Sequence, residues 1–168
     1  FFIRRSRGYV PTAIQLHEEG PEVLGCGADI KNTFTLTKGS FAIPGQHIGD
    51  MENYETVLFF EESLRNLKDV YRVKPVALAY DLHPIYLSTQ WAEKQEGIEK
   101  VGIQHHYAHI ASVMAEKGIK EKVIGVSFDG TGYYAKINNV VYVFLGMEEA
   151  KPQTPRSPMR TRANAPAR

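Results

Sequence analysis

Short apolar runs alternate with helix-type segments from residue 54 to residue 128, and this alternation restricts the fold more than any other feature. A strand–helix–strand order favours right-handed crossovers and a largely parallel sheet. We therefore expect an α/β fold. The strand-length runs are 76–80, 100–104 and 123–128, and the helical segments are about 54–71, 86–94 and 107–117.

The segment before the first helix has strand character. Apolar residues in 22–28 and alternation in 33–37 predict a β-hairpin with its turn near 29–32, and 41–43 predicts another short strand. Asp50 stands before the first helix as a candidate N-cap. Gly118 follows the third helix as a candidate C-terminal cap.

Composition is that of an ordinary globular domain, with 43% hydrophobic and 23% charged residues in 168. The net charge of +1 gives no overall positive field, so we expect no nucleic-acid partner. This net charge hides an asymmetry, because residues 151–168 hold five basic and no acidic residues and leave −4 for residues 1–150. No apolar run approaches the roughly 20 residues of a membrane helix. The single cysteine excludes an internal disulfide and favours a cytoplasmic location.

Polar residues follow each of the three predicted strands. Because the carboxyl ends of parallel strands meet at one edge of a sheet, where α/β proteins bind ligands, these residues predict a site there. In strand order they are Asp81 and His83, then His105, His106 and His109, then Asp129.

His105 and His109 are four residues apart at the start of a predicted helix, so their imidazoles share one helix face. That spacing suits two ligands of one divalent metal ion, and Asp129 could supply a third ligand. Iron, zinc and manganese all accept mixed His/Asp ligation. A zincin-type protease needs Glu after the first histidine, where this chain has His106. The alternative is that one histidine caps the helix while the other packs or faces solvent.

The loop Asp129-Gly130-Thr131-Gly132 is typical of phosphate-binding loops. Its glycines let backbone N–H groups approach an anion, and Thr131 adds a hydroxyl. A turn that requires glycine is the alternative. The Walker A and Rossmann glycine patterns are both absent from the sequence.

Two further positions lie near the predicted hairpin. Lys31 and Asn32 could contact phosphates, or they could be ordinary residues of a surface turn. Cys26 stands in an apolar strand, which favours a buried and inert thiol over a nucleophile.

Five motif regions, in order over residues 3–133, resemble the HypF family of carbamoyltransferases. They are RRSRGYVP at 4–11, ADIKNTF at 28–34 with QHIGDMEN at 46–53, AYDLHPIYLST at 79–89, QHHYAHIAS at 104–112 and FDGTGY at 128–133. The resemblance implies that residues 1–20 end a YrdC-like domain and its linker. Residues 21–146 would be the N-terminal part of a Kae1-like domain. That part is the incomplete first lobe of an actin-like ATPase, with an N-terminal β-hairpin and βαβ units.

The resemblance also implies a function. HypF enzymes use carbamoyl phosphate and ATP to make carbamoyl adenylate, and they carbamoylate the C-terminal cysteine of HypE in the synthesis of cyanide ligands during [NiFe]-hydrogenase maturation. His105, His109 and Asp129 match the family's metal positions. The predicted nucleotide-binding residues are Lys31, Asn32, Asp81, His83, Gly130, Thr131 and Gly132. Which residues are catalytic is unknown, and the family's zinc-finger module with its zinc is not encoded here.

The sequence departs from the family pattern after Tyr133. Residues 134–139 lack the expected glycine-rich hairpin, and the proline-rich basic segment 147–168 predicts a disordered tail. We therefore expect a fragment, as from a truncated or frameshifted gene, that encodes half of a site and does not turn over alone. The alternatives are a Kae1/TsaD-like threonylcarbamoyl transferase relative and a non-catalytic metal-binding remnant of a truncated gene.

Overall fold

The computed structural model describes residues 12–128 and 140–145. The Asp129–Gly132 loop, the segment 1–11 and the predicted tail 147–168 lie outside the described residues. The elements, in chain order, are β1 (Ile14–Gly20), β2 (Val23–Gly25), β3 (Thr35–Pro44), α1 (Tyr54–Tyr71), β4 (Ala77–Asp81), α2 (Leu87–Glu93), β5 (Glu99–Ile103), α3 (His105–Lys117), β6 (Val123–Phe128) and β7 (Val140–Leu145). The α/β prediction is confirmed as a mixed sheet with three helices in the described part of the chain.

Five strands form the main sheet in the order β1-β3-β2-β4-β5. The β2, β4 and β5 strands are parallel, whereas β3 pairs antiparallel with both β1 and β2. The predicted hairpin is confirmed as β2 and β3, where Leu24 lies opposite Leu36. The segment 41–43 continues β3 instead of forming a strand of its own. The sequence predicts no strand at β1, because its apolar alternation ends after Leu16.

The prediction of a largely parallel sheet with β6 as its third strand is wrong. Among the described residues, β6 pairs only with β7, antiparallel, in a separate two-stranded sheet. The third parallel strand of the main sheet is β2.

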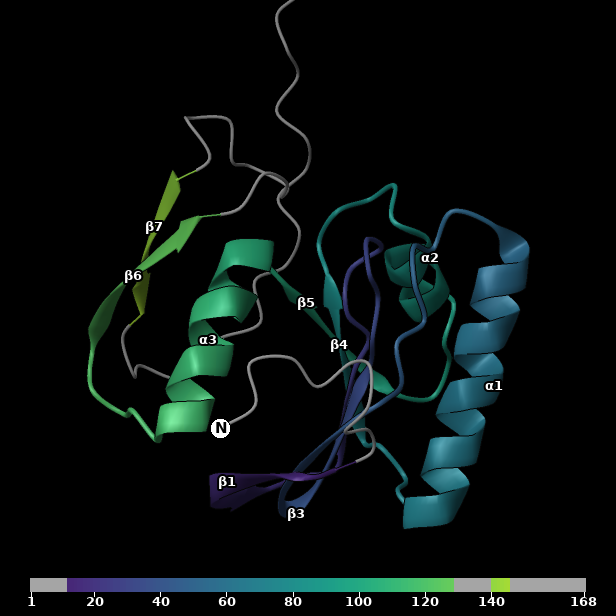
Figure 1. Ribbon diagram of the computed structural model, residues 1–168, viewed down its shortest axis with the longest axis horizontal. Helices are drawn as coiled ribbons and strands as arrows, with labels where there is room; N and C mark the ends of the chain where they lie inside the picture. The colour runs from purple at the N-terminus through teal and green to yellow at the C-terminus, as the bar shows by residue number, and fades with distance from the viewer. Residues whose placement is uncertain (1–11, 129–139, 146–168) are drawn as a thin grey trace, which may run out of the picture.

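Figure 1 shows α3 with β6 and β7 on one side of the main sheet, and α1 with α2 on the other. The α3 helix ends at Gly118, whose left-handed φ of 63° confirms it as the predicted C-terminal cap.

The hydrophobic core fills the space between the sheet and helices α1 and α2. Phe60 of α1 is fully buried, and its ring meets Phe34 and Trp91 edge to face, with ring centroids 5.5 and 4.9 Å away. The other buried apolar residues of this core are Leu24, Cys26, Leu36, Ile48, Met51, Leu64, Val73, Leu78 and Ala92.

Among the described residues, no helix combines the length and apolarity needed to cross a bilayer.

The N-cap of α1 differs from the prediction. Asn53 caps the helix, since its side-chain oxygen accepts from the Thr56 N–H at 2.9 Å. Asp50 instead accepts a hydrogen bond from the backbone N–H of Lys31 at 2.6 Å. Asp50 therefore stabilises the β2–β3 loop, a role that depends on a contact distant in sequence.

Candidate functional site

The carboxyl ends of the three parallel strands meet at one edge of the sheet. Asp81, the last residue of β4, lies opposite Ile103 of β5, and α3 begins two residues after Ile103. The β2 strand lies on the other side of β4, so the loop after Gly25 reaches the same edge. The predicted gathering of strand ends is thus confirmed for β4 and β5, while β2 takes the place expected for β6.

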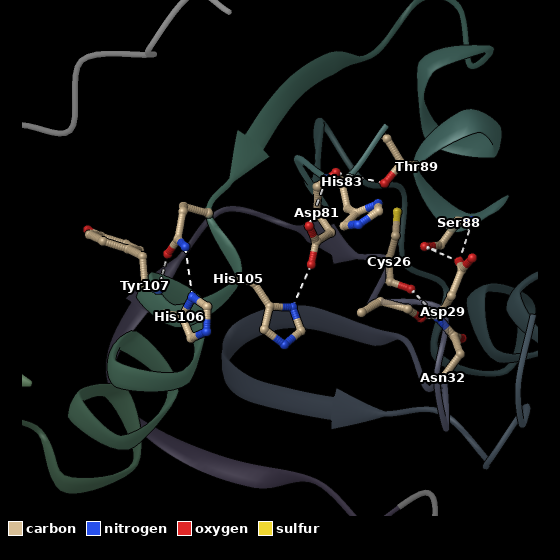
Figure 2. A network of polar contacts seen from close by, with 12 residues as sticks. Cys26, Asp29, Asn32, Asp81, His83, Ser88, Thr89, His105, His106 and Tyr107 are labelled. Carbon is tan, nitrogen blue, oxygen red and sulfur yellow. Dashed lines mark hydrogen bonds and ion pairs between the residues drawn. The ribbon is translucent and has the colours of Figure 1, made fainter. Parts of the chain in front are cut away.

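Asp81 and His105 make the closest polar contact at this edge. Asp81 Oδ2 and His105 Nδ1 are 2.6 Å apart, and the side chains are only 6% and 15% exposed, respectively. The other carboxylate oxygen of Asp81 accepts from the backbone N–H of His83 at 2.9 Å. Its backbone carbonyl accepts from the hydroxyl of Thr89 at 2.7 Å. Asp81 is therefore fixed at three points, and Figure 2 shows its carboxylate directed at the His105 ring.

His105 and His109 lie together on α3, as the sequence predicts. Their ring centroids are 4.9 Å apart and the rings are nearly perpendicular. His105 is half-buried and His109 is exposed, so the pair lies at the border between protein and solvent. The expected shared helix face is confirmed.

His106 has a different environment. It is fully buried, and its Nδ1 lies 2.9 Å from the side-chain nitrogen of Gln104. Gln104 also caps α3, because its side-chain oxygen accepts from the Tyr107 N–H at 2.8 Å. Gln104 therefore serves as both cap and partner of His106, a role that the sequence does not predict.

Two of the described residues, His105 and His109, have the chemistry expected of ligands to the predicted metal ion. An ionised Asp81 can only accept, so His105 Nδ1 donates to it and leaves Nε2 with a lone pair, an arrangement common among metal-bound histidines. His109 adds a second imidazole on the same face. Within residues 12–128 and 140–145, no group of three or more His, Cys, Asp or Glu side chains could hold a metal. The third predicted ligand, Asp129, lies outside the described residues.

The β2–β3 loop positions Lys31 and Asn32. Asn32 is 2% exposed, and its side-chain nitrogen donates to the carbonyl of Cys26 at 3.0 Å. A second bond from that nitrogen reaches the carbonyl of Ala28. Lys31 has an exposed side chain and a left-handed φ of 51°, which is uncommon for a residue with a side chain. Lys31 can therefore meet a ligand from solvent, whereas Asn32 mainly holds the loop.

Asp29, like Asn32, uses its side chain to hold distant backbone in place, a role that its local sequence does not predict. Its carboxylate accepts from the backbone N–H groups of Leu87 and Ser88 at 2.8 and 3.0 Å and from the Ser88 hydroxyl at 2.9 Å. It therefore caps α2 from a position 59 residues away from Ser88, a distance over which local patterns carry no signal.

His83 and Cys26 complete the edge. The His83 ring stacks on Tyr86, with ring centroids 4.0 Å apart and planes 8° from parallel. Cys26 has no exposed surface, and its burial raises the pKa of the thiol to about 12. The prediction that Cys26 is buried is confirmed, and a thiol with this pKa is a poor nucleophile near neutral pH.

Comparisons with known proteins agree with the family resemblance that the sequence motifs indicate. The model of the HypF Kae1-like domain family matches residues 18–116. The chain is 46% identical over 134 residues to "Carbamoyltransferase HypF2" of Cupriavidus necator. This match covers 78% of the chain and 17% of that relative. It is 42% identical over 132 residues to "Carbamoyltransferase HypF" of Rhizobium leguminosarum bv. viciae, covering 79% of the chain and 17% of the relative. The chain therefore spans about a sixth of the length of these relatives.

Two solved structures are similar over the same region. One is full-length HypF in the phosphate- and nucleotide-bound form, with a TM-score of 0.74 and 46% identity over 78% of this chain and 21% of that one. The other is HypF of T. kodakarensis, with a TM-score of 0.72 and 38% identity over 83% of this chain and 19% of that one. The similarity therefore extends from sequence to backbone.

Proposed function

Because the chain belongs to the HypF Kae1-like domain family, we propose that it forms one wall of the carbamoyl-transfer site of a HypF-type carbamoyltransferase. The observation that carries this proposal is the arrangement of Asp81, His105 and His109 at the carboxyl edge of the parallel strands. The relatives that match the chain are named carbamoyltransferases. We further propose that the described sheet is the first lobe of an actin-like ATPase, as the Kae1-like domain name implies.

In this proposal, His105, His109 and Asp129 hold a divalent metal ion. When bound, such an ion supplies positive charge that orients phosphate oxygens. Asp81 keeps the His105 ring in place, and the exposed Lys31 ammonium offers a positive charge to phosphate from the β2–β3 loop. His83, Asn32 and the 130–132 loop remain proposed neighbours of the nucleotide.

The proposed substrates are those of the family. Carbamoyl phosphate, ATP and water give carbamoyl adenylate, phosphate and pyrophosphate, and the thiol sulfur of the HypE C-terminal cysteine then bonds to the carbamoyl carbon. The bond from that carbon to the AMP phosphate oxygen breaks, so AMP and the thiol proton are released. Transfer of this kind requires that both reactants be held together. The matched residues cover 17% of the relative's length, and we propose that residues 1–168 alone are inactive. A cytoplasmic location remains part of the proposal.

A complementation assay tests this function. The chain would be mixed with a HypF relative from which the matching segment has been deleted, together with carbamoyl phosphate, ATP, Fe(II) or Zn(II) and HypE. Mass spectrometry of the HypE C-terminal peptide should show a carbamoyl adduct with both pieces and none with either piece alone.

Matched histidine variants make the assay specific. His109→Ala should abolish the restored transfer, because one proposed ligand is lost. His17→Ala, which removes an exposed histidine of β1, should leave it unchanged. Transfer by the chain alone, or equal transfer with His109→Ala, would contradict the proposal. The threonylcarbamoyl alternative predicts a modified nucleoside in place of the peptide adduct.

A further inference from the structure

We infer that Asp81 is a positioning residue that fixes the tautomer of His105, so that the Nε2 lone pair of His105 is presented to the proposed metal ion. This inference rests on the proposed metal-binding role of His105 and His109. It moves Asp81 from the group of predicted nucleotide contacts to a role exerted through His105.

The contact between the two side chains supports this role. Asp81 Oδ2 lies 2.6 Å from His105 Nδ1, and both side chains are largely shielded from water. An ionised carboxylate has no hydrogen to donate, so the hydrogen in this bond must be on Nδ1. In a neutral imidazole the lone pair is then on Nε2, on the side of the ring that faces away from Asp81 (Figure 2).

Asp81 is held firmly enough to impose this choice. Its second carboxylate oxygen accepts from the His83 N–H at 2.9 Å, and its carbonyl accepts from the Thr89 hydroxyl at 2.7 Å. The carboxylate cannot rotate away from His105 without losing the bond to His83. Carboxylates that orient a metal-bound imidazole in this way raise the basicity of the ligand and fix its direction.

The neighbouring histidine is held in the opposite tautomer. The side-chain oxygen of Gln104 accepts from the Tyr107 N–H, so the amide NH2 group must face His106. His106 Nδ1 is thus an acceptor, and the proton of neutral His106 is on Nε2. In their neutral forms these two adjacent histidines therefore differ in tautomer, and of the two it is His105 that has the lone pair on Nε2.

Asp81→Asn tests the role with a nearly equal volume. The asparagine oxygen can keep the bond to the His83 N–H, which turns the amide NH2 group toward His105. His105 Nδ1 must then accept, and its proton moves to Nε2, where it blocks metal binding. We expect Zn(II) affinity to fall about 10- to 100-fold, the range seen when orienting partners of metal ligands are removed.

Two measurements on the full chain test the inference. Nitrogen-15 NMR of the metal-free protein, above the pH range in which imidazoles usually titrate, should show His105 protonated on Nδ1 and His106 on Nε2. In Asp81→Asn, the His105 proton should appear on Nε2. Calorimetry with Zn(II) then compares the wild type, Asp81→Asn, His109→Ala and Asp29→Asn. Asp29→Asn is the control, because it removes a carboxylate that contacts α2 and not His105.

The outcomes separate this inference from the proposed function. If the wild type binds no Zn(II), or binds it equally well after His109→Ala, the proposed metal role fails, and the NMR result still decides the tautomer. A wild-type His105 protonated on Nε2 would overturn the inference, as would wild-type affinity in a folded Asp81→Asn. If circular dichroism shows that Asp81→Asn is unfolded, the wild-type tautomer alone decides.

Discussion

Two polar clusters lie at the same edge of the sheet, and they use their buried polar groups differently. In the β2–β3 loop, Asp29 accepts two backbone N–H groups and one hydroxyl of α2, and Asn32 donates to two backbone carbonyls. At the β4–β5 edge, Asp81 uses one oxygen for a backbone N–H and the other for the ring of His105.

The difference separates polar residues that hold the fold from polar residues that prepare a site. Each oxygen of the Asp29 carboxylate and the amide nitrogen of Asn32 are satisfied by backbone groups or a neighbouring hydroxyl, so their contribution is mainly to stability. The Asp81 carboxylate is satisfied by a side chain that retains a second functional nitrogen. Substitutions in the loop should therefore change stability, whereas substitutions at Asp81 should change metal affinity.

The largest expected effect concerns Cys26 in the loop cluster. At pH 8, burial that raises its pKa from 9.0 to about 12 should make the thiolate about a thousandfold rarer than in the unfolded chain. A thiol reagent such as DTNB should therefore modify the folded chain at least that much more slowly than the urea-unfolded chain. Similar rates in the two states would contradict the buried placement of Cys26.

The same pKa shift makes stability depend on pH. The folded state keeps the Cys26 proton at pH values where the unfolded state has lost it. The associated stability is fully present below about pH 9 and is lost as the pH rises toward about 12. Urea unfolding of the wild type and of Cys26→Ala should show this decline only in the wild type, over and above the titration that both share.

Asn32→Ala should cause the next largest effect. It leaves the carbonyls of Cys26 and Ala28 without their buried donor, which should lower the free energy of unfolding by about 2–4 kcal/mol. Urea denaturation followed by circular dichroism gives this value. A loss below about 0.5 kcal/mol, the range of ordinary surface substitutions, would remove Asn32 from the group of structural residues.

Asp29→Ala should destabilise the chain by about 1–2 kcal/mol, since the N-terminus of α2 loses its acceptor. Zn(II) affinity should remain that of the wild type. A large loss of affinity without unfolding would break the distinction between the two clusters, because it would connect Asp29 with the histidine pair.

Gln104→Ala should have the smallest effect on stability, about 1 kcal/mol, from loss of the α3 cap. It also removes the donor to His106 Nδ1, so NMR should show that the tautomer preference of His106 weakens while that of His105 persists. A change at His105 and none at His106 would reverse the assigned partners.

Local patterns predicted the elements at this edge closely. The apolar spacing expected of a helix from Tyr54 to Tyr71 is found in α1, although the cap is Asn53 and not the expected Asp50. The strands expected at 76–80 and 100–104 are displaced by one residue. The shared face of His105 and His109 also followed from spacing. These predictions are correct because helical and extended periodicity can be recognised within a short window of sequence.

The elements, the family motifs and the pair of histidines on α3 can therefore be predicted from local sequence patterns. The place of β2 beside β4, in the position expected for β6, cannot be predicted in this way. The same holds for the contacts of Asp81 with His105, 24 residues away, and of Asp29 with Ser88, 59 residues away. Strand order and side-chain partners depend on how distant segments pack. Packing brings one buried carboxylate to backbone N–H groups and another to an imidazole, a difference that the two aspartates themselves do not encode.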